Sequence, residues 1–131
     1  MMTDRITRCD GPFRHIIQDG VEVDGWIYLS GQLSVDQDAQ LVGGDDLAQQ
    51  FQGAYRNVEA TLRSFAADMG HVVEETLFVT DIRAFLARSD ELFALRTQAY
   101  GGEPRVAQTL VQVVALGVPG AMVEIKCVAR R

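Results

Sequence analysis

The most regular hydrophobic pattern lies in the C-terminal stretch from Val106 to Arg131. Two apolar runs there, at 109–116 and 121–129, flank the sequence Gly117-Val118-Pro119-Gly120. Apolar runs of this length that are rich in valine are typical of strands, and glycine and proline favour a turn between them. The pattern therefore predicts a hairpin of two paired strands at this end of the chain.

Three further short strands are predicted near the N-terminus. They cover residues 13–17, 21–23 and 26–29. Asp24-Gly25 lies between the second and the third, and Asp-Gly is a strong signal for a two-residue hairpin turn. Ser30-Gly31 follows, where the glycine permits a bend or a close backbone approach that a side chain would prevent. Residues 34–44 are polar and without periodicity, so they are predicted to form a loop.

A long helix is predicted to begin near residue 47, capped by Asp45 or Asp46 and ended by Gly70. Its apolar residues are separated by steps of three and four, which places them together on one face of the helix. They are Leu47, Phe51, Ala54, Val58, Leu62, Phe65 and Met69. The spacing therefore predicts a single buried stripe.

From residue 72 the pattern changes to a period of two, which indicates a strand with Leu77 and Val79 on one face. A second helix is predicted within residues 84–100, and Gly101-Gly102 is expected to end it. Its start stays open, because Ser89 is also able to cap a restarted turn.

This order of strands and helices predicts one α+β domain over residues 1–131, with two helices on one face of a mixed sheet. The last two predicted strands are apolar on both faces, whereas a strand with one face in water would be polar at every second position. No chain remains to cover the second face. We therefore expect another copy of the protein to cover it, in a closed homo-oligomer.

Composition and charge narrow the range of partners. The chain has 131 residues, 47% of them hydrophobic, and a net charge of −6 without a basic cluster, which argues against a nucleic-acid partner. No apolar run is long enough to form a signal peptide core or to span a bilayer, so we expect a cytoplasmic protein with no membrane partner. Cys9, Cys127, His15 and His71 lack metal-ligand spacing, so neither a disulfide framework nor a metal site is predicted.

Four segments carry a resemblance to a known family. They are Tyr28-Leu29-Ser30-Gly31-Gln32, Asn57-Val58-Glu59-Ala60, Thr76-Leu77-Phe78-Val79-Thr80-Asp81 and Val123-Glu124-Ile125-Lys126-Cys127-Val128-Ala129. In this order and spacing the chain resembles the Rid family, the YjgF-like reactive-intermediate deaminases, from about residue 21 to 130. The resemblance implies a chorismate-mutase-like α+β protomer with a mixed six-stranded sheet and two helices on one face. It also implies a homotrimer whose sheets line a barrel, with a ligand cleft at each subunit interface.

In active members of that family the cleft hydrolyses imines and enamines to a carbonyl compound and ammonia, without a metal or another cofactor. Such a site must hold the substrate carboxylate, place a water molecule and move a proton. Glu124 matches the family glutamate that orients the water, although from spacing alone it could equally be a solvated strand residue. Ser30 and Gly31 match the backbone that lines the cleft, and Ser89 matches a polar helix residue that contacts ligand or caps the helix.

The family binds the substrate carboxylate with an arginine at the start of the penultimate strand. Aligning the family's Val-Glu-Val with 111–113, and allowing one extra residue in the 117–120 turn, puts Gln108 at that position. Its amide can donate and accept hydrogen bonds but carries no charge and no guanidinium fork. Arg105 is the only nearby substitute, and it would serve only with a reshaped entry to the strand; the other residues predicted to bind substrate on this strand are Thr109 and Leu110.

Two hypotheses follow from the resemblance. In the first, the protein is an imine or enamine deaminase with a divergent substrate, in which Gln108 contacts the substrate and Glu124 handles the water. In the second, it is a non-catalytic homotrimer that binds a small metabolite in the same cleft, as a sensor or scavenger. Position 108 discriminates between them, because losing the arginine argues against ordinary imine hydrolysis.

Overall fold

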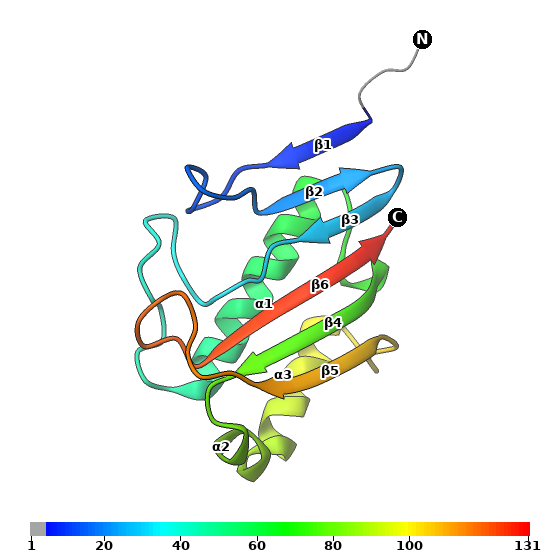
Figure 1. Cartoon of the computed structure of the whole chain (residues 1–131). Helices are drawn as coiled ribbons and strands as arrows, with labels where there is room; N and C mark the ends of the chain where they lie inside the picture. The colour runs from blue at the N-terminus through cyan, green and yellow to red at the C-terminus, as the bar shows by residue number, and fades with distance from the viewer. Residues whose placement is uncertain (1–4) are drawn as a thin grey trace.

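The computed structural model describes residues 5–131, which form a six-stranded mixed sheet with all helices on one face (Figure 1). The chain runs through β1 (Ile6–Cys9), β2 (Gly20–Val23), β3 (Trp26–Leu29), α1 (Leu47–Ser64), the 3₁₀ helix η1 (Met69–His71), β4 (Val72–Val79), α2 (Ile82–Ala87), α3 (Ser89–Tyr100), β5 (Ala107–Gln112) and β6 (Val123–Arg130). Across the sheet the strand order is β1-β2-β3-β6-β4-β5. The predicted α+β class is confirmed. None of the helices in this range combines the length and the hydrophobicity that a membrane span needs.

The predicted Asp24-Gly25 hairpin is confirmed. Both residues have positive φ, 50° and 86°, as a two-residue turn of this type requires, and β2 pairs antiparallel with β3. The strand predicted at 13–17 is wrong, because these residues form turns in which the N–H groups of Ile16 and Ile17 donate to the carbonyl of Phe13. The first strand is β1 instead, paired antiparallel with β2.

The predicted C-terminal hairpin is also wrong, because β4 lies between β5 and β6 (Figure 1). Strand β4 pairs in parallel with β5, with Thr76 opposite Thr109, and antiparallel with β6, with Thr76 opposite Lys126. Residues 113–122 therefore carry the chain past the end of β4. Two apolar runs around a turn show the same pattern in both arrangements, and the backbone of β4 offers hydrogen bonds to each run.

Helix α1 carries the predicted stripe but ends sooner than predicted. The side chain of Asp46 caps its start by accepting hydrogen bonds from two N–H groups of the first turn. The helix ends at Ser64 and not near Gly70, since Ala66 adopts a left-handed conformation with φ of 55°. All residues of the stripe are nevertheless buried, because Phe65 and Met69 pack into the core from beyond the helix end.

The second predicted helix is confirmed, with a break at Arg88 that divides it into α2 and α3. Gly101, with φ of 75°, ends α3 as predicted. Ser89 is the first residue of α3 and not its cap, because the cap position falls on Arg88, which makes no side-chain capping hydrogen bond. Helices α1 and α3 pack together on the same side of the sheet (Figure 1).

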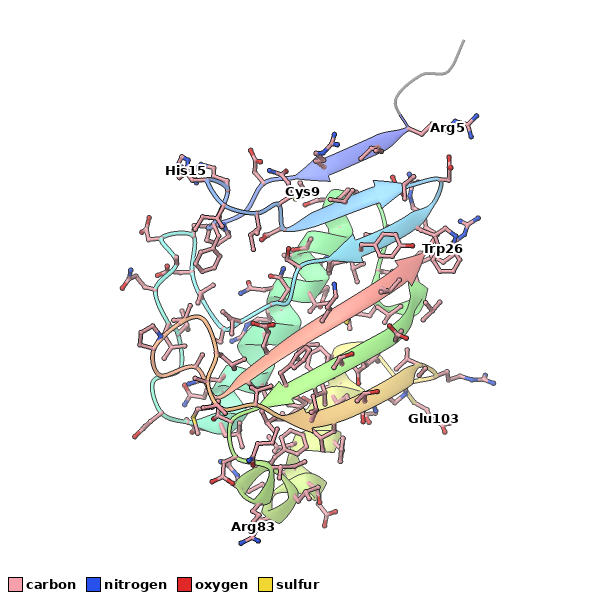
Figure 2. All side chains as sticks on the ribbon, viewed as in Figure 1. Arg5, Cys9, His15, Trp26, Arg83 and Glu103 are labelled. Atoms are coloured by element: carbon pink, nitrogen blue, oxygen red, sulfur yellow. The ribbon has the colours of Figure 1, made fainter. Side chains whose placement is uncertain are left out.

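The two faces of the sheet are covered differently. On the helix side, Ile27, Leu77 and Ile125 are completely buried. The side chains that alternate with these lie on the opposite side of the sheet, which we call the open face. Figures 1 and 2 show this face toward the viewer, with the helices behind it. On β3, β6, β4 and β5 this face carries Trp26, Tyr28, Glu74, Thr76, Phe78, Ala107, Thr109, Val111, Glu124, Lys126, Val128 and Arg130. Tyr28 and Val111 are 47% and 36% exposed there.

Candidate functional site

Gly31 and Glu124 meet where the chain leaves β3 and enters β6. Backbone hydrogen bonds in both directions join Gln32 to Ile125 (2.7 and 2.9 Å) in an antiparallel bridge, so Gly31 and Glu124 lie diagonally across it, and the Glu124 side chain reaches over Gly31. A Cβ atom added to Gly31 would lie only 2.1 Å from Oε2 of Glu124. Only glycine leaves room for the carboxylate at this position.

A cavity of about 290 Å³ opens beside this pair. Its lining is mostly apolar and consists of Phe13, Ile16, Ile17, Gly31, Leu33, Gly117, Val118 and Glu124. A smaller cavity of about 50 Å³ shares four of these residues and adds polar groups, among them Asp19 and Asn57. An apolar hollow with a few convergent polar groups is typical of a small-molecule site.

Two carboxyl groups in these cavities are less acidic than usual. Partial burial raises the pKa of Glu124, and the nearby Lys126 ammonium opposes the shift. Burial likewise raises the pKa of Asp19, opposed by a side-chain hydrogen bond with Gln32. A carboxylate of raised pKa is a stronger base than a solvated one, so each is suited to accept a proton. Among residues 5–131, no three histidine, cysteine or carboxylate side chains are arranged to hold a metal ion.

Ser30 and Lys126 fix the backbone around Gly31. The Ser30 hydroxyl donates to the carbonyl of Gln18 (2.6 Å), and its N–H donates to the carbonyl of Asp19 (2.8 Å). These bonds hold the turn segment 11–19, and with it Phe13 and Ile17, over the cavity. The Lys126 ammonium donates to the carbonyl of Leu29 (2.7 Å), directly before Ser30-Gly31.

Gln108 lies away from this group. Its side-chain amide donates to Glu75 (2.9 Å), a fully buried residue on the helix side of the sheet. Side chains alternate between the two faces along a strand, so Gln108 and Glu124 lie on opposite faces. Thr109, the next residue, lies on the open face, as Glu124 does.

The remaining predicted residues are also dispersed within the protomer. Leu110 lies on the helix side and packs against the core. Ser89 is half-buried at the start of α3 and lines neither of the two cavities near Gly31. Arg105 lines a separate cavity that includes Glu103, and Figure 2 shows Glu103 at the opposite end of the sheet from the loop that follows β3. The structure thus brings Ser30, Gly31 and Glu124 together but not these three.

Sequence reasoning missed Asp19 and Lys126 and gave the wrong local structure for two other residues of the site. Phe13 and Ile17 were assigned to a strand, although they line the cavity from a turn. Asp19 gave no signal, because its position depends on how the turn segment folds back. Lys126 did give one: it follows Glu124 by two positions on a predicted strand, and residues at that spacing share a face.

Comparisons with known proteins agree with this fold. Residues 11–131 match the family described as Endoribonuclease L-PSP. Protein DfrA of Myxococcus xanthus is 32% identical over 127 residues, which cover 97% of this chain and 91% of that protein. The mouse 2-iminobutanoate/2-iminopropanoate deaminase is 32% identical over 120 residues, covering 91% of this chain and 81% of that protein. A crystal structure of a YjgF/YER057c/UK114 family member from Mycobacterium tuberculosis superposes with a TM-score of 0.78 at 28% identity, covering 96% of this chain and 99% of that one.

Proposed function

The chain belongs to the endoribonuclease L-PSP family, also called the YjgF or Rid family, and we propose that it hydrolyses a small imine or enamine. The products would be a carbonyl compound and ammonia. Relatives from mouse and rat, 32% and 34% identical, are named 2-iminobutanoate/2-iminopropanoate deaminase. The observation that carries the proposal is the Glu124 carboxylate, which lies against Gly31 at the mouth of an apolar cavity.

The proposed reaction needs one proton carrier. Water attacks the carbon of the protonated C=N bond while the Glu124 carboxylate accepts a proton from that water. The resulting carbinolamine has a hydroxyl and an amino group on the same carbon. Glu124 then returns the proton to the amino group. As the C–N bond breaks and the C=O bond forms, the Glu124 carboxylate accepts the hydroxyl proton and passes it to the departing ammonia, which leaves as ammonium. One protonated imine and one water thus give one carbonyl compound and one ammonium ion.

An RNA substrate fits this cavity poorly, despite the name of the family. The two ionisable groups at the cavities are the carboxyls of Asp19 and Glu124, and the whole chain has a net charge of −6. RNA binding instead depends on clustered cations that neutralise phosphates. We therefore assign the cavity to a small imine.

The same proposal includes a homotrimer in which the open face is the subunit interface. Tyr28, Phe78 and Val111 give that face apolar area that a water-facing sheet would not normally carry. The cavity beside Glu124 is mostly apolar and open to solvent, and a neighbouring subunit would close it. The family resemblance supports three copies around a closed barrel.

Val111→Asp is expected to dissociate the trimer into monomers. An aspartate at this position would place an unpaired charge inside the interface, which costs several kcal/mol. Light scattering measures the mass directly. Leu86→Asp is the matched control, because Leu86 is also an exposed apolar residue (52%) but lies on α2, away from the open face. A trimer that persists in Val111→Asp, or a natural protein that is already monomeric, would contradict the assembly.

The natural protein is expected to accelerate the release of keto acid and ammonia from imines formed in place by an amino-acid oxidase. Both products are measured over time against buffer and against heat-inactivated protein. The test uses several amino acids, since the cavity's apolar walls favour imines with small apolar side chains. Rates equal to those in buffer for every imine would contradict the deaminase proposal and favour the alternative, a non-catalytic trimer that binds a metabolite.

A further inference from the structure

Lys126 places a positive charge beside Glu124 on the open face. The two residues are separated by one position on β6, so their Cα atoms lie roughly 7 Å apart on the same face. The Lys126 ammonium donates to the carbonyl of Leu29 (2.7 Å), the residue directly before Ser30-Gly31. The ammonium and the Glu124 carboxylate therefore both lie on the open face, next to the Ser30-Gly31 backbone that borders the cavity. An ammonium has three donors, and the bond to Leu29 uses one.

Lys126 also lies in the same row of the sheet as Thr109. Thr76 pairs with both residues, so Lys126, Thr76 and Thr109 form one line across β6, β4 and β5. If the family alignment is made without the extra residue in the 117–120 turn, the arginine position falls on Thr109 instead of Gln108. This alignment also agrees with the faces, because Thr109 and Glu124 share the open face. In this alignment Thr109 replaces the family arginine and carries no charge, and Lys126 on β6 supplies the positive charge instead.

Several other cations of the described chain are poorly placed for this role. Arg130 shares the open face, but it lies four residues beyond Lys126 on β6, over the Trp26 ring. Arg96 and Arg131 are paired with Glu75 and Glu22 on the helix side. Arg105 lies in a separate cavity. Arg14 is exposed in the turn that supplies Phe13 and lies on none of the strands that form the open face. It therefore serves as the control for a nearby positive charge.

We propose that Lys126 binds the carboxylate of the ligand in this site, in place of the arginine of the family. The inference rests on the proposed function for the identity of the reaction, but not for the binding step. The ligand would be anchored at its carboxylate by the ammonium, with its reacting carbon toward Glu124 and its side chain in the apolar cavity. A charge-assisted hydrogen bond to a carboxylate is among the stronger polar contacts in proteins.

The test measures binding of 2-oxobutanoate, a carboxylate of the expected product class, by calorimetry and by NMR titration. Lys126→Met removes the charge and keeps the length of the side chain, whereas Lys126→Arg keeps the charge. Binding is expected to weaken about tenfold or more in Lys126→Met and to remain within about threefold in Lys126→Arg. Arg14→Met should bind like the natural protein. Where turnover is measurable, Lys126→Met should raise KM more than it lowers kcat.

Several outcomes would overturn this assignment. They are unchanged binding in Lys126→Met, an equal loss in Arg14→Met, or no binding of 2-oxobutanoate by the natural protein. If Lys126→Met does not fold, as judged by circular dichroism, Lys126→Gln and the salt dependence of binding to the natural protein decide the question. Lys126-dependent binding without imine hydrolysis would refute the deaminase proposal alone. Imine hydrolysis with a KM unaffected by Lys126→Met would refute the role of Lys126 alone.

Discussion

Glu75→Ala is expected to lower the free energy of unfolding by about 3–5 kcal/mol. The Glu75 carboxylate is completely buried between β4 and the helices. It accepts hydrogen bonds from Arg96 (2.5 Å), Tyr100 (2.7 Å), Tyr55 (2.8 Å) and Gln108 (2.9 Å). Burial, followed by the charge of Glu75, raises the pKa of Tyr55, so its hydroxyl keeps the proton that it donates.

The expected size follows from what the alanine leaves behind. The Arg96 side chain is only 14% exposed, and without Glu75 its charge loses the partner that the ion pair supplies. Two tyrosine hydroxyls lose their acceptor at the same time. Domains of this size have a stability of about 5–15 kcal/mol, so the loss would remove a large share of it.

Urea unfolding measures the effect as a shift of the midpoint, and the neighbouring residue provides the control. Glu74 precedes Glu75 on β4 but is exposed in the protomer, and alanine adds no charge to the proposed interface, so Glu74→Ala should change stability by roughly 0.5 kcal/mol or less. Removing both members of the pair, with Glu75→Met and Arg96→Met together, should cost less than the sum of the two single changes. Equal stability of Glu75→Ala and Glu74→Ala would show that the buried network contributes nothing.

Local patterns predicted the elements well, because each depends on residues close in sequence. The stripe of α1, the Asp24-Gly25 turn and the alternation of β4 were all found in this way. The order of strands was not, because β5 and β6 have the same apolar pattern whether they pair with each other or with β4. Glu75 shows the same limit. It alternates with Leu77 and shares its buried face, but no local pattern indicates its partners, which come from α1, α3 and β5.

The residues of the candidate site also divide into some that the sequence predicted correctly and one that it did not. The family resemblance identified Glu124 and Gly31, and the structure places them in contact. The same resemblance pointed to Gln108 through an alignment with one extra residue in a turn. A shift of one residue along a strand moves a side chain to the opposite face, and in the structure Gln108 faces Glu75 instead of the cavity. Sequence spacing alone does not reveal which of two neighbouring strand residues faces the open side.

Glu124→Gln is expected to lower kcat/KM for imine hydrolysis by a factor of about 10²–10⁴, the usual contribution of a positioned proton carrier. Glutamine keeps the shape of the side chain but cannot accept the proton from water. Because Glu124 is half-buried beside Gly31, the change should leave the fold and the melting temperature nearly unaffected. Gly31→Ala tests the same contact from the other side, since the added Cβ would displace the carboxylate and should also lower the rate.

The pH dependence separates loss of a base from loss of binding. Burial raises the pKa of Glu124 above its usual value of 4.5, so the carboxylate form, which accepts the proton, is depleted as the pH falls through that raised pKa. The kcat/KM of the natural protein should therefore rise with pH on its acid side, with a midpoint above 4.5. Glu74→Gln removes the other glutamate of the open face and should keep this rise of kcat/KM with pH, called the acid limb. Glu124→Gln should lose it, and an identical limb in Glu124→Gln would mean that another group, with Asp19 the first candidate, carries the proton.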